Sequence, residues 1–350
     1  MKKASAEDDS HVLQAADAAK LQSAHAGAVD ELLREDSPPA NVVGVGVGVK
    51  WTDGVPTGKP AVLVLVTQKL EESALDSDHL VPGTIAGSPT DVLTVGVPIA
   101  GDAPPVEPQA LARRIRPAQG GWSVGHFQIT AGTIGTCVYD ILPGGSTGPP
   151  VAGIGIPPRF YILSNNHVLA NVNAASIGDP ILQPGPFDGG TNPADKIATL
   201  SRFVPIQLNP PIPLPLHRNV VDCAAAEGPF DQLDRQVYWS GVVRGWRRKA
   251  NVQVGAPVKK TGRTTNFTVG RITAVNATID VNYGGGRVGR FHDQIVTTNM
   301  SAGGDSGSLV MTPDGVAVGL LFAGSSVAMI ANQIENVRSL LRVEVAESIL

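Results

Sequence analysis

The segment SAGGDSGSLV, residues 301–310, places Ser306 between Asp305 and Gly307 in front of an apolar run. Glycine and aspartate are unfavourable in strands, so this grouping marks a tight turn or a close approach to a ligand. Three interpretations are open from this segment alone: a plain turn, a loop that cradles a phosphate group, or a turn that presents a nucleophilic serine. A serine hydroxyl is a weak nucleophile, so the third interpretation requires an activating base elsewhere in the chain.

Two other segments supply the groups that such a serine needs. His167 follows an apolar stretch in YILSNNHVLA, and Asp222 lies within the apolar segment NVVDCAAAE. A carboxylate in that context is costly to bury without a partner. An imidazole can take the serine proton when a buried carboxylate holds its tautomer. The residue types and their order predict acyl transfer, with Ser306 as nucleophile, His167 as general base and Asp222 as orienting acid.

The glycines beside the serine fit the same chemistry. The backbone N–H groups of Gly304 and Ser306 can point at a developing oxyanion only where no bulky side chain intervenes. Asp195, in NPADKIATL, is an alternative orienting acid. We prefer Asp222 because its neighbours are apolar, whereas Asp195 is expected on a loop.

Other candidate sites are weaker. KKTGRTT (259–265) places its lysines before its single glycine, which is the wrong spacing for a phosphate-binding P-loop. We expect a strand and turn there, and its cations could still orient a substrate. Three histidines share no spacing that suggests a metal site and are expected to be structural or at the surface: His126, His217 and His292.

The composition indicates a turn-rich β protein. The chain has 350 residues, 42% of them hydrophobic, with 40 glycines, 28 prolines and only 5% aromatic residues. Such a mixture suits short strands and tight turns better than a helical bundle. The net charge of −4 gives no general positive field, so neither nucleic acid nor an anionic membrane is expected as a partner.

Compartment signals favour the cytoplasm. The N-terminal residues lack the continuous apolar core of a secretory signal, and no stretch reaches the length of a membrane span. Two cysteines, Cys137 and Cys223, are too few for a disulfide framework. We therefore expect a cytoplasmic protein with free thiols.

The N-terminal part is predicted to form a small α/β domain. A segment spanning 1–36 contains an amphipathic helix over residues 10–35. Residues 40–100 follow with the strands NVVGVGVGVK, AVLVLVTQKL and TDVLTVGVPI. The glycines of 41–50 lack the spacing of a dinucleotide-binding loop, so we expect a strand with one small-residue face. Residues 101–110 have the composition of a linker.

From residue 111 to 350 the pattern predicts a β-sandwich or barrel, because short apolar segments alternate with Gly, Pro and Asn turns. A last helix is expected over residues 332–342, with its apolar side chains on one face. The predicted strands cover residues 132–140, 160–165, 221–227, 236–246, 268–283, 293–299, 306–311, 315–324 and 326–331.

The order histidine, aspartate, serine and the GDSGS segment resemble the chymotrypsin- and trypsin-like serine proteases. Further segments resemble the bacterial relatives of the plant narrow-leaf proteases: GGWSVGH, AGTIGTCVYD, LSNNHVLA, KKTGRTTNFTVGRI and GGDSGSLV. The resemblance covers most of residues 40–345. It implies a mainly β fold with a double β-barrel protease domain behind the N-terminal domain. It also implies that His167, Asp222 and Ser306 are catalytic and that Gly304 and Ser306 bind the oxyanion.

The resemblance further locates a specificity pocket. Its base falls at Met300, and its wall consists of Phe322, Ala323 and Gly324. Methionine cannot pair with a cationic side chain, whose burial alone is costly. We therefore expect cleavage after apolar residues.

Activation by cleavage is a further hypothesis. In secreted trypsins the acid that matches Asp305 pairs with a newly cut N-terminal amine. A dibasic site ending at Arg114 precedes Ile115 upstream of the protease segments. Cleavage there would release such an amine.

The predicted function is that of a serine endopeptidase that acts on a polypeptide through an acyl-enzyme and needs no metal or organic cofactor. Two alternatives remain open: a catalytically silent protease-fold protein that binds peptides or scaffolds a complex, and an esterase-type hydrolase that uses the same site. Contacts between copies through the N-terminal domain would make a homo-oligomer.

Overall fold

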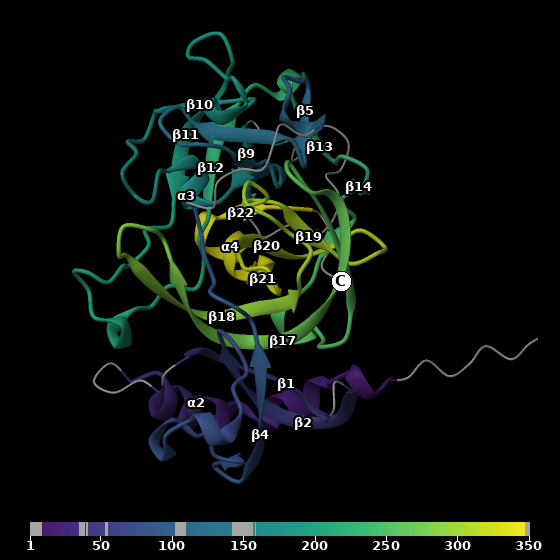
Figure 1. Cartoon of the computed structure of the whole chain (residues 1–350). Coiled ribbons are helices and arrows are strands. Elements are labelled where there is room, and N and C mark those ends of the chain that lie inside the picture. The colour runs from purple at the N-terminus through teal and green to yellow at the C-terminus, as the bar shows by residue number, and fades with distance from the viewer. Residues whose placement is uncertain are drawn as a thin grey trace, which may run out of the picture.

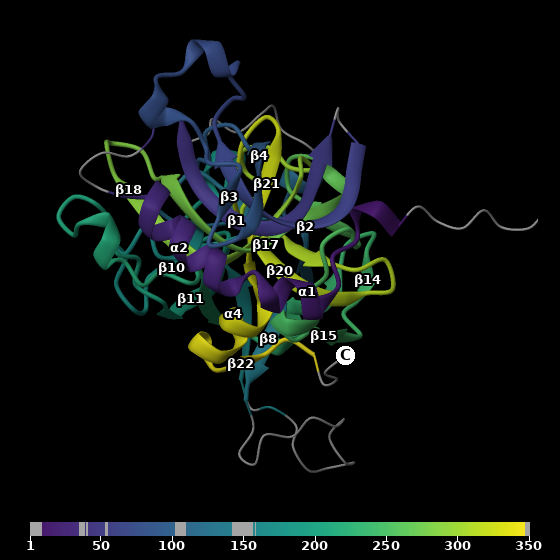
Figure 2. The ribbon, with the colours of Figure 1, turned by 90° about the horizontal axis from the view of Figure 1, so that it is seen from below.

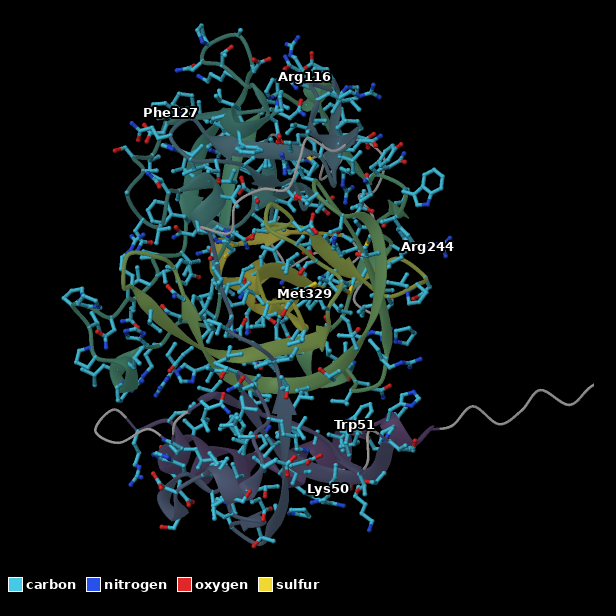
Figure 3. The ribbon with its side chains drawn as sticks, in the orientation of Figure 1. Lys50, Trp51, Arg116, Phe127, Arg244 and Met329 are labelled. Carbon is cyan, nitrogen blue, oxygen red and sulfur yellow. The ribbon has the colours of Figure 1, made fainter. Side chains whose placement is uncertain are left out.

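The computed structural model describes residues 9–34, 39, 41–52, 55–101, 110–141, 157 and 159–346. Two β-barrels and an N-terminal unit lie in a row, with the first barrel at the top of Figure 1, the second in the middle and the N-terminal unit at the bottom. Seen from below, the N-terminal helices and strands lie in front of the second barrel (Figure 2). Arg116 and Phe127 mark one end of the molecule and Trp51 the other, with Met329 between them (Figure 3).

The N-terminal unit packs two helices against a small sheet. Ala24, Ala28 and Leu32 are buried in one cluster with valines of the first two strands. The helix predicted over residues 10–35 is divided, because the N–H of Leu21 bonds to the carbonyl of Ala18, a tighter turn than that of an α-helix. The elements are α1 (Ala15–Lys20), α2 (Gln22–Leu32), β1 (Val42–Thr52), β2 (Val55–Val66), β3 (Thr84–Ile85) and β4 (Ser88–Thr94), with 3-10 turns at Asp9–His11, Glu72–Ala74 and Ser77–His79.

The second barrel is a closed sheet. Its strands are hydrogen-bonded in the order β16, β19, β20, β21, β18, β17, and β16 pairs again with β17. The bounds are β16 (Pro257–Gly262), β17 (Asn266–Asn282), β18 (Val288–Thr298), β19 (Leu309–Met311), β20 (Val316–Gly324) and β21 (Ala328–Gln333). The short β15 (Gly245–Trp246) lies parallel to β20, and α4 (Ile334–Leu341) follows β21 directly.

The first barrel has the strand order β22, β8, β9, β12, β11, β10, β6, β7. A small third sheet of β14, β13 and β5 lies beside it. The bounds are β5 (Ala118–Gly120), β6 (Ser123–His126), β7 (Gly132–Thr133), β8 (Thr136–Asp140), β9 (Phe160–Ser164), α3 (Asn166–Leu169), β10 (Pro180–Leu182), β11 (Lys196–Phe203), β12 (Ala224–Gly228), β13 (Leu233–Val237), β14 (Gly241–Val242) and β22 (Val343–Glu344). Further 3-10 turns lie at Ala110–Ala112, Pro186–Asp188, Leu214–Leu216, Phe230–Gln232 and Lys249–Asn251.

The long strand β17 joins the N-terminal unit to the second barrel. One edge pairs with β18, while the other pairs first with β16 and then, from Val275 to Ile279, with β1. The small-residue face predicted for β1 makes this contact possible. A Cβ added at Gly44 would lie 2.6 Å from the backbone oxygen of Thr278, closer than side chains approach.

The predicted mainly β fold with two barrels is confirmed, and strands occupy most of the predicted segments. The N-terminal strands continue the sheet of the second barrel, in the order β17, β1, β2, β4, β3. The predicted linker falls largely on residues 102–109, which lie outside the described residues, as does most of the proline-rich insert 143–158.

Both cysteines are free and buried, in different hydrophobic clusters. Burial raises the pKa of the Cys137 thiol to about 12 and that of Cys223 well above its ordinary value. Both side chains are therefore protonated thiols. In the part of the chain described here, helices are all too short or too polar to cross a membrane.

We predict that Gly44→Ala destabilises the fold by about 1–3 kcal/mol, because the new methyl group overlaps the backbone of β17. Gly83→Ala is the matched control, since an added Cβ there meets no atom within 4 Å. Thermal unfolding measures both variants. Equal melting temperatures would contradict the described contact between β1 and β17.

Candidate active site

His167 and Asp222 are in direct contact. His167 lies in α3, the single helical turn after β9, and its Nδ1 is 2.6 Å from Oδ2 of Asp222. The backbone N–H of His167 also donates to Oδ1 of the same carboxylate, at 3.2 Å. Both side chains are buried. The carboxylate thus fixes both the ring and the start of the helical turn that carries it.

Residues of both barrels surround Asp222. The hydroxyl of Tyr283, directly after β17, donates to Oδ2 at 2.7 Å. The backbone N–H of Asp222 donates to Oδ1 of Asn332 in β21, and the backbone carbonyl of Asp222 accepts from Nδ2 of Asn165. Burial, and then the charge of Asp222, raise the pKa of Tyr283 well above its usual range. The phenol therefore keeps its proton and acts as a donor to the carboxylate.

The loop that carries Ser306 is shaped by two glycines. Gly304 and Gly307 have φ angles of +96° and +97°, which side-chain-bearing residues rarely adopt. A Cβ at Gly307 would overlap Ser164 and the backbone of Thr133. The N–H of Thr133 donates to the carbonyl of Ser306 at 2.8 Å and joins the loop to the first barrel. Within the described chain, no acceptor pairs with the backbone N–H groups of Gly304 and Ser306.

The structure places Ser306 close to the histidine segment without a hydrogen bond between them. A Cβ added at Gly132 would lie within 3.0 Å of the carbonyl oxygen of Ser306 and also of the side chain of Val168, which follows His167 in the chain. Nε2 of His167 is buried and has no hydrogen-bond partner among the described residues. The geometry therefore brings His167 and Asp222 together and leaves the link from His167 to Ser306 unmade.

Asp305 has an internal cationic partner. Its Oδ2 lies 2.8 Å from Nζ of Lys260, and both side chains are inaccessible to solvent. The backbone N–H groups of Thr264, Thr265 and Ala302 donate to the same carboxylate. Burial lowers the pKa of Lys260, while the charge of Asp305 opposes that shift. The ion pair anchors the Ser306 loop to β16, and the backbone donors Thr264 and Thr265 anchor it to the turn that follows.

This pairing answers the activation hypothesis. The N–H of Ile115 donates to Oε1 of Gln183, and the side chain of Arg114 lies near Asp195. Asp305 is already neutralised by Lys260 in the uncut chain, so the structure gives no support to activation by cleavage after Arg114. Two of the three cations of KKTGRTT, Lys260 and Arg263, are fully buried and so do not face a substrate.

A second buried ion pair holds the first-barrel side of the loop. The guanidinium of Arg263 contacts the carboxylate of Asp188, with Nε 2.8 Å from Oδ2, and neither side chain is exposed. The backbone N–H of Arg263 donates to the hydroxyl of Thr133. That hydroxyl in turn donates to the carbonyl of Gly304 at 2.9 Å. The loop conformation thus depends on buried charges from both barrels.

A cavity of about 480 Å³ lies beside Ser306. Its lining is Ile99, Gly101, Asn299, Ser301, Ala302, Gly303, Gly304, Ser306, Leu321, Ala323, Gly324, Ser325 and Ser326. Ala323 and Gly324 belong to it as predicted by the resemblance. Met300 and Phe322 do not, because their side chains are buried in two hydrophobic clusters instead. Neighbours on an extended chain point to opposite sides, so Asn299 and Ser301 face the cavity where Met300 was expected.

The remaining candidates lie elsewhere. Asp195 accepts from the N–H of Thr191 within its own turn. His126 contacts Asp179, and His217 and His292 are held by backbone and side-chain contacts away from His167. Of the described histidine, cysteine and acidic residues, no three gather in a way that could hold a metal ion. Tyr283 was missed because a single tyrosine after a strand carries no sequence signal.

Two curated proteins are similar to parts of this chain. Glutamyl endopeptidase 2 of Streptomyces griseus is 46% identical over 69 residues, which is 20% of this chain and 34% of that protein. Serine protease 2 of Streptomyces fradiae is 39% identical over 95 residues, which is 27% of this chain and 45% of that protein. The chain thus spans less than half the length of the curated relatives it matches, and no protein-family model matches it. The resemblance to bacterial serine proteases is confirmed over these segments.

Two solved structures align with 65% of this chain. Protease A of Thermobifida fusca gives a TM-score of 0.43 at 17% identity, with 96% of its own chain covered. The chymotrypsin of Cellulomonas bogoriensis gives a TM-score of 0.42 at 19% identity, also with 96% covered. These alignments identify no site residue, so the roles of the residues depend on the contacts described above.

We predict that Lys260→Met destabilises the protein by about 3–5 kcal/mol, because it leaves the carboxylate of Asp305 buried without its cation. Lys259→Met is the matched control. Among the described residues, its Nζ bonds to the carbonyls of Ser240 and Pro313, in a less buried position. Urea unfolding of both variants measures the difference. Similar losses in the two variants would show that the buried pair does not hold the loop.

Proposed function

We propose that this chain is a serine endopeptidase that cleaves peptide bonds by acyl transfer. The observation that carries the proposal is the contact of 2.6 Å between Nδ1 of His167 and the buried carboxylate of Asp222. Such a carboxylate holds the imidazole in the tautomer whose Nε2 can accept a proton. That nitrogen is buried and has no hydrogen-bond partner among the described residues.

In the proposed reaction, Oγ of Ser306 attacks the carbonyl carbon of the substrate while Nε2 of His167 takes its proton. The imidazolium then gives this proton to the leaving amine, which leaves an acyl-enzyme. A water molecule, deprotonated by the same imidazole, attacks the acyl carbon; the bond to Oγ then breaks, the imidazolium returns the proton to Oγ of Ser306, and the acid is released. The backbone N–H groups of Gly304 and Ser306 would donate to the oxyanion in both tetrahedral intermediates.

Asp222 and Tyr283 support this reaction without touching the substrate. The charge of Asp222 stabilises the imidazolium that forms at each step. Tyr283, whose raised pKa keeps it a donor, occupies a lone pair of the carboxylate and fixes its orientation. The catalytic hydrogen bond from serine to histidine is often long in unliganded enzymes and shortens when substrate binds.

One observation favours an alternative function. Because Nε2 of His167 has no partner among the described residues, the serine is not activated in this arrangement. A catalytically silent protein that binds peptides in the groove would have the same geometry. An esterase would use the same residues as the protease and differs only in its substrate.

We predict that Ser306→Ala lowers kcat for casein hydrolysis by about 10⁴-fold or more, because the nucleophile is lost. Ser176→Ala, at an exposed serine of the first barrel, is the control and should retain full activity. A fluorophosphonate probe should label the wild-type protein and the control but not Ser306→Ala. Absence of labelling in all three would favour the silent binding protein, while labelling with turnover of esters but not of casein would favour the esterase.

Substrate preference is proposed from the cavity beside Ser306. Its described lining has no charged side chain, so a buried lysine or arginine of the substrate would lack a partner. Leu321 and Ala323 supply apolar surface, which supports the expected preference for apolar residues. The glutamyl specificity in the name of one relative points instead to a carboxylate. However, Oγ of Ser325 already donates to the carbonyl of Val95, which leaves fewer hydroxyl donors for a carboxylate.

The preference is tested with internally quenched peptides that differ only in the residue before the cleaved bond. We predict that leucine is cleaved about 100-fold faster than lysine in kcat/KM, because a buried unpaired charge costs several kcal/mol. Glutamate and glutamine form a matched pair. Faster cleavage after glutamate than after leucine and glutamine would replace the apolar preference with recognition of a carboxylate.

The cytoplasmic location and the polypeptide partner expected from the sequence stay predictions, as does the narrower resemblance to the relatives of the plant narrow-leaf proteases.

A further inference from the structure

The segment between β4 and the described end at Gly101 runs across the second barrel into the candidate active site. Ile99 forms β-bridges on both sides, antiparallel with Gly324 at the end of β20 and parallel with Asn282 at the end of β17. These two strands are separated by β21 and β18 in the barrel. The segment therefore lies between strand ends that the barrel keeps apart.

Four backbone hydrogen bonds hold the segment in place. The N–H of Ile99 donates to the carbonyl of Gly324 at 3.0 Å, and the N–H of Gly324 donates back at 3.2 Å. On the other side, the N–H of Ala100 donates to the carbonyl of Asn282 at 2.9 Å, and the N–H of Asn282 donates to the carbonyl of Pro98 at 3.0 Å. An extended peptide that binds to a strand edge makes the same kind of backbone pairs.

The segment also points toward the reacting groups. Ile99 and Gly101 line the cavity that contains Ser306, and a Cβ at Gly101 would lie 3.9 Å from Cδ2 of His167. The chain runs from Pro98 toward His167 in the N-to-C direction. The acyl side of a bound substrate also runs in this direction toward its cleaved bond.

Burial follows the pattern of a bound peptide. Ala100 is only 1% exposed, whereas Ile99 is 39% exposed and is held by its backbone. At Gly101 the φ angle is +94°, so the extended path ends there in a conformation that favours glycine.

We propose that residues 98–101 are an intramolecular plug that occupies the acyl-side peptide groove and competes with substrate. This rests on the proposed function of the same site. The plug is tethered through β4, which pairs with β2, and by the bond from the N–H of Val95 to the carbonyl of Val66. Tethering gives the segment a high effective concentration at the groove. The N-terminal unit, joined to the barrel through β1 and β17, thus regulates access to Ser306.

The first test compares casein hydrolysis by the full chain, Ile99→Pro and Ile99→Val. Proline removes the N–H that bonds to Gly324, whereas valine keeps it and is the matched control. We expect Ile99→Pro to lower KM about fivefold to tenfold, the effect of one backbone hydrogen bond, with kcat changed less than about twofold. Equal KM values in all three proteins would overturn the plug. Ala100→Glu, which puts a charge at a buried position, gives a second variant should Ile99→Pro fold poorly.

The second test does not require catalysis. A fluorescein-labelled peptide with the sequence of residues 95–100, VGVPIA, is titrated into Ser306→Ala and into the double variant Ser306→Ala with Ile99→Pro. We expect the double variant to bind it about fivefold to tenfold more tightly. Equal binding would overturn the plug. If wild-type protein neither turns over casein nor reacts with a fluorophosphonate probe, the proposed function fails, while this binding difference still decides the plug.

Discussion

The rest of the site depends on the hydrogen bonds that the buried carboxylate of Asp222 accepts. It accepts from the ring and the backbone of His167 and from the hydroxyl of Tyr283. A buried charge of this kind is tolerated only when hydrogen bonds surround it. Because its donors come from both barrels, the ionised carboxylate and the docking of the two barrels stabilise each other. The same contact that makes His167 a candidate base therefore also holds the halves of the molecule in register.

The loop of Ser306 is built on the same principle. Asp305 is paired with Lys260 of the second barrel, and Arg263 reaches across to Asp188 of the first. Buried pairs are weak contributors to net stability, but the loss of one partner leaves an unpaired charge that is costly. These pairs thus specify one conformation of the loop. Gly304 and Gly307 permit that conformation, and the buried charges select it.

Much of this arrangement could be predicted from the sequence, and the failures have physical causes. Asp222 lies within an apolar run, His167 follows one and Ser306 precedes one, and each of these is a local signal. Tyr283 and the partners of Asp305 carry no such signal, because their contacts form only when distant strands meet. Met300 is buried in the core while its neighbours Asn299 and Ser301 line the cavity, and a shift of one residue along the chain is enough to move a side chain between the two. The pairing of β1 with β17 could not be predicted either, because the sequence of a strand does not specify which distant strand pairs with its edge.

The burial of the two thiols determines how the fold responds to reducing and oxidising surroundings. Cys137 and Cys223 are the only cysteines in the sequence, and each lies alone in its own apolar cluster. The thiolate, the form that reacts with oxidants and disulfides, is suppressed in both by burial. The covalent connectivity of the native chain is consequently the same in reducing and in oxidising surroundings, and its stability owes nothing to a cross-link.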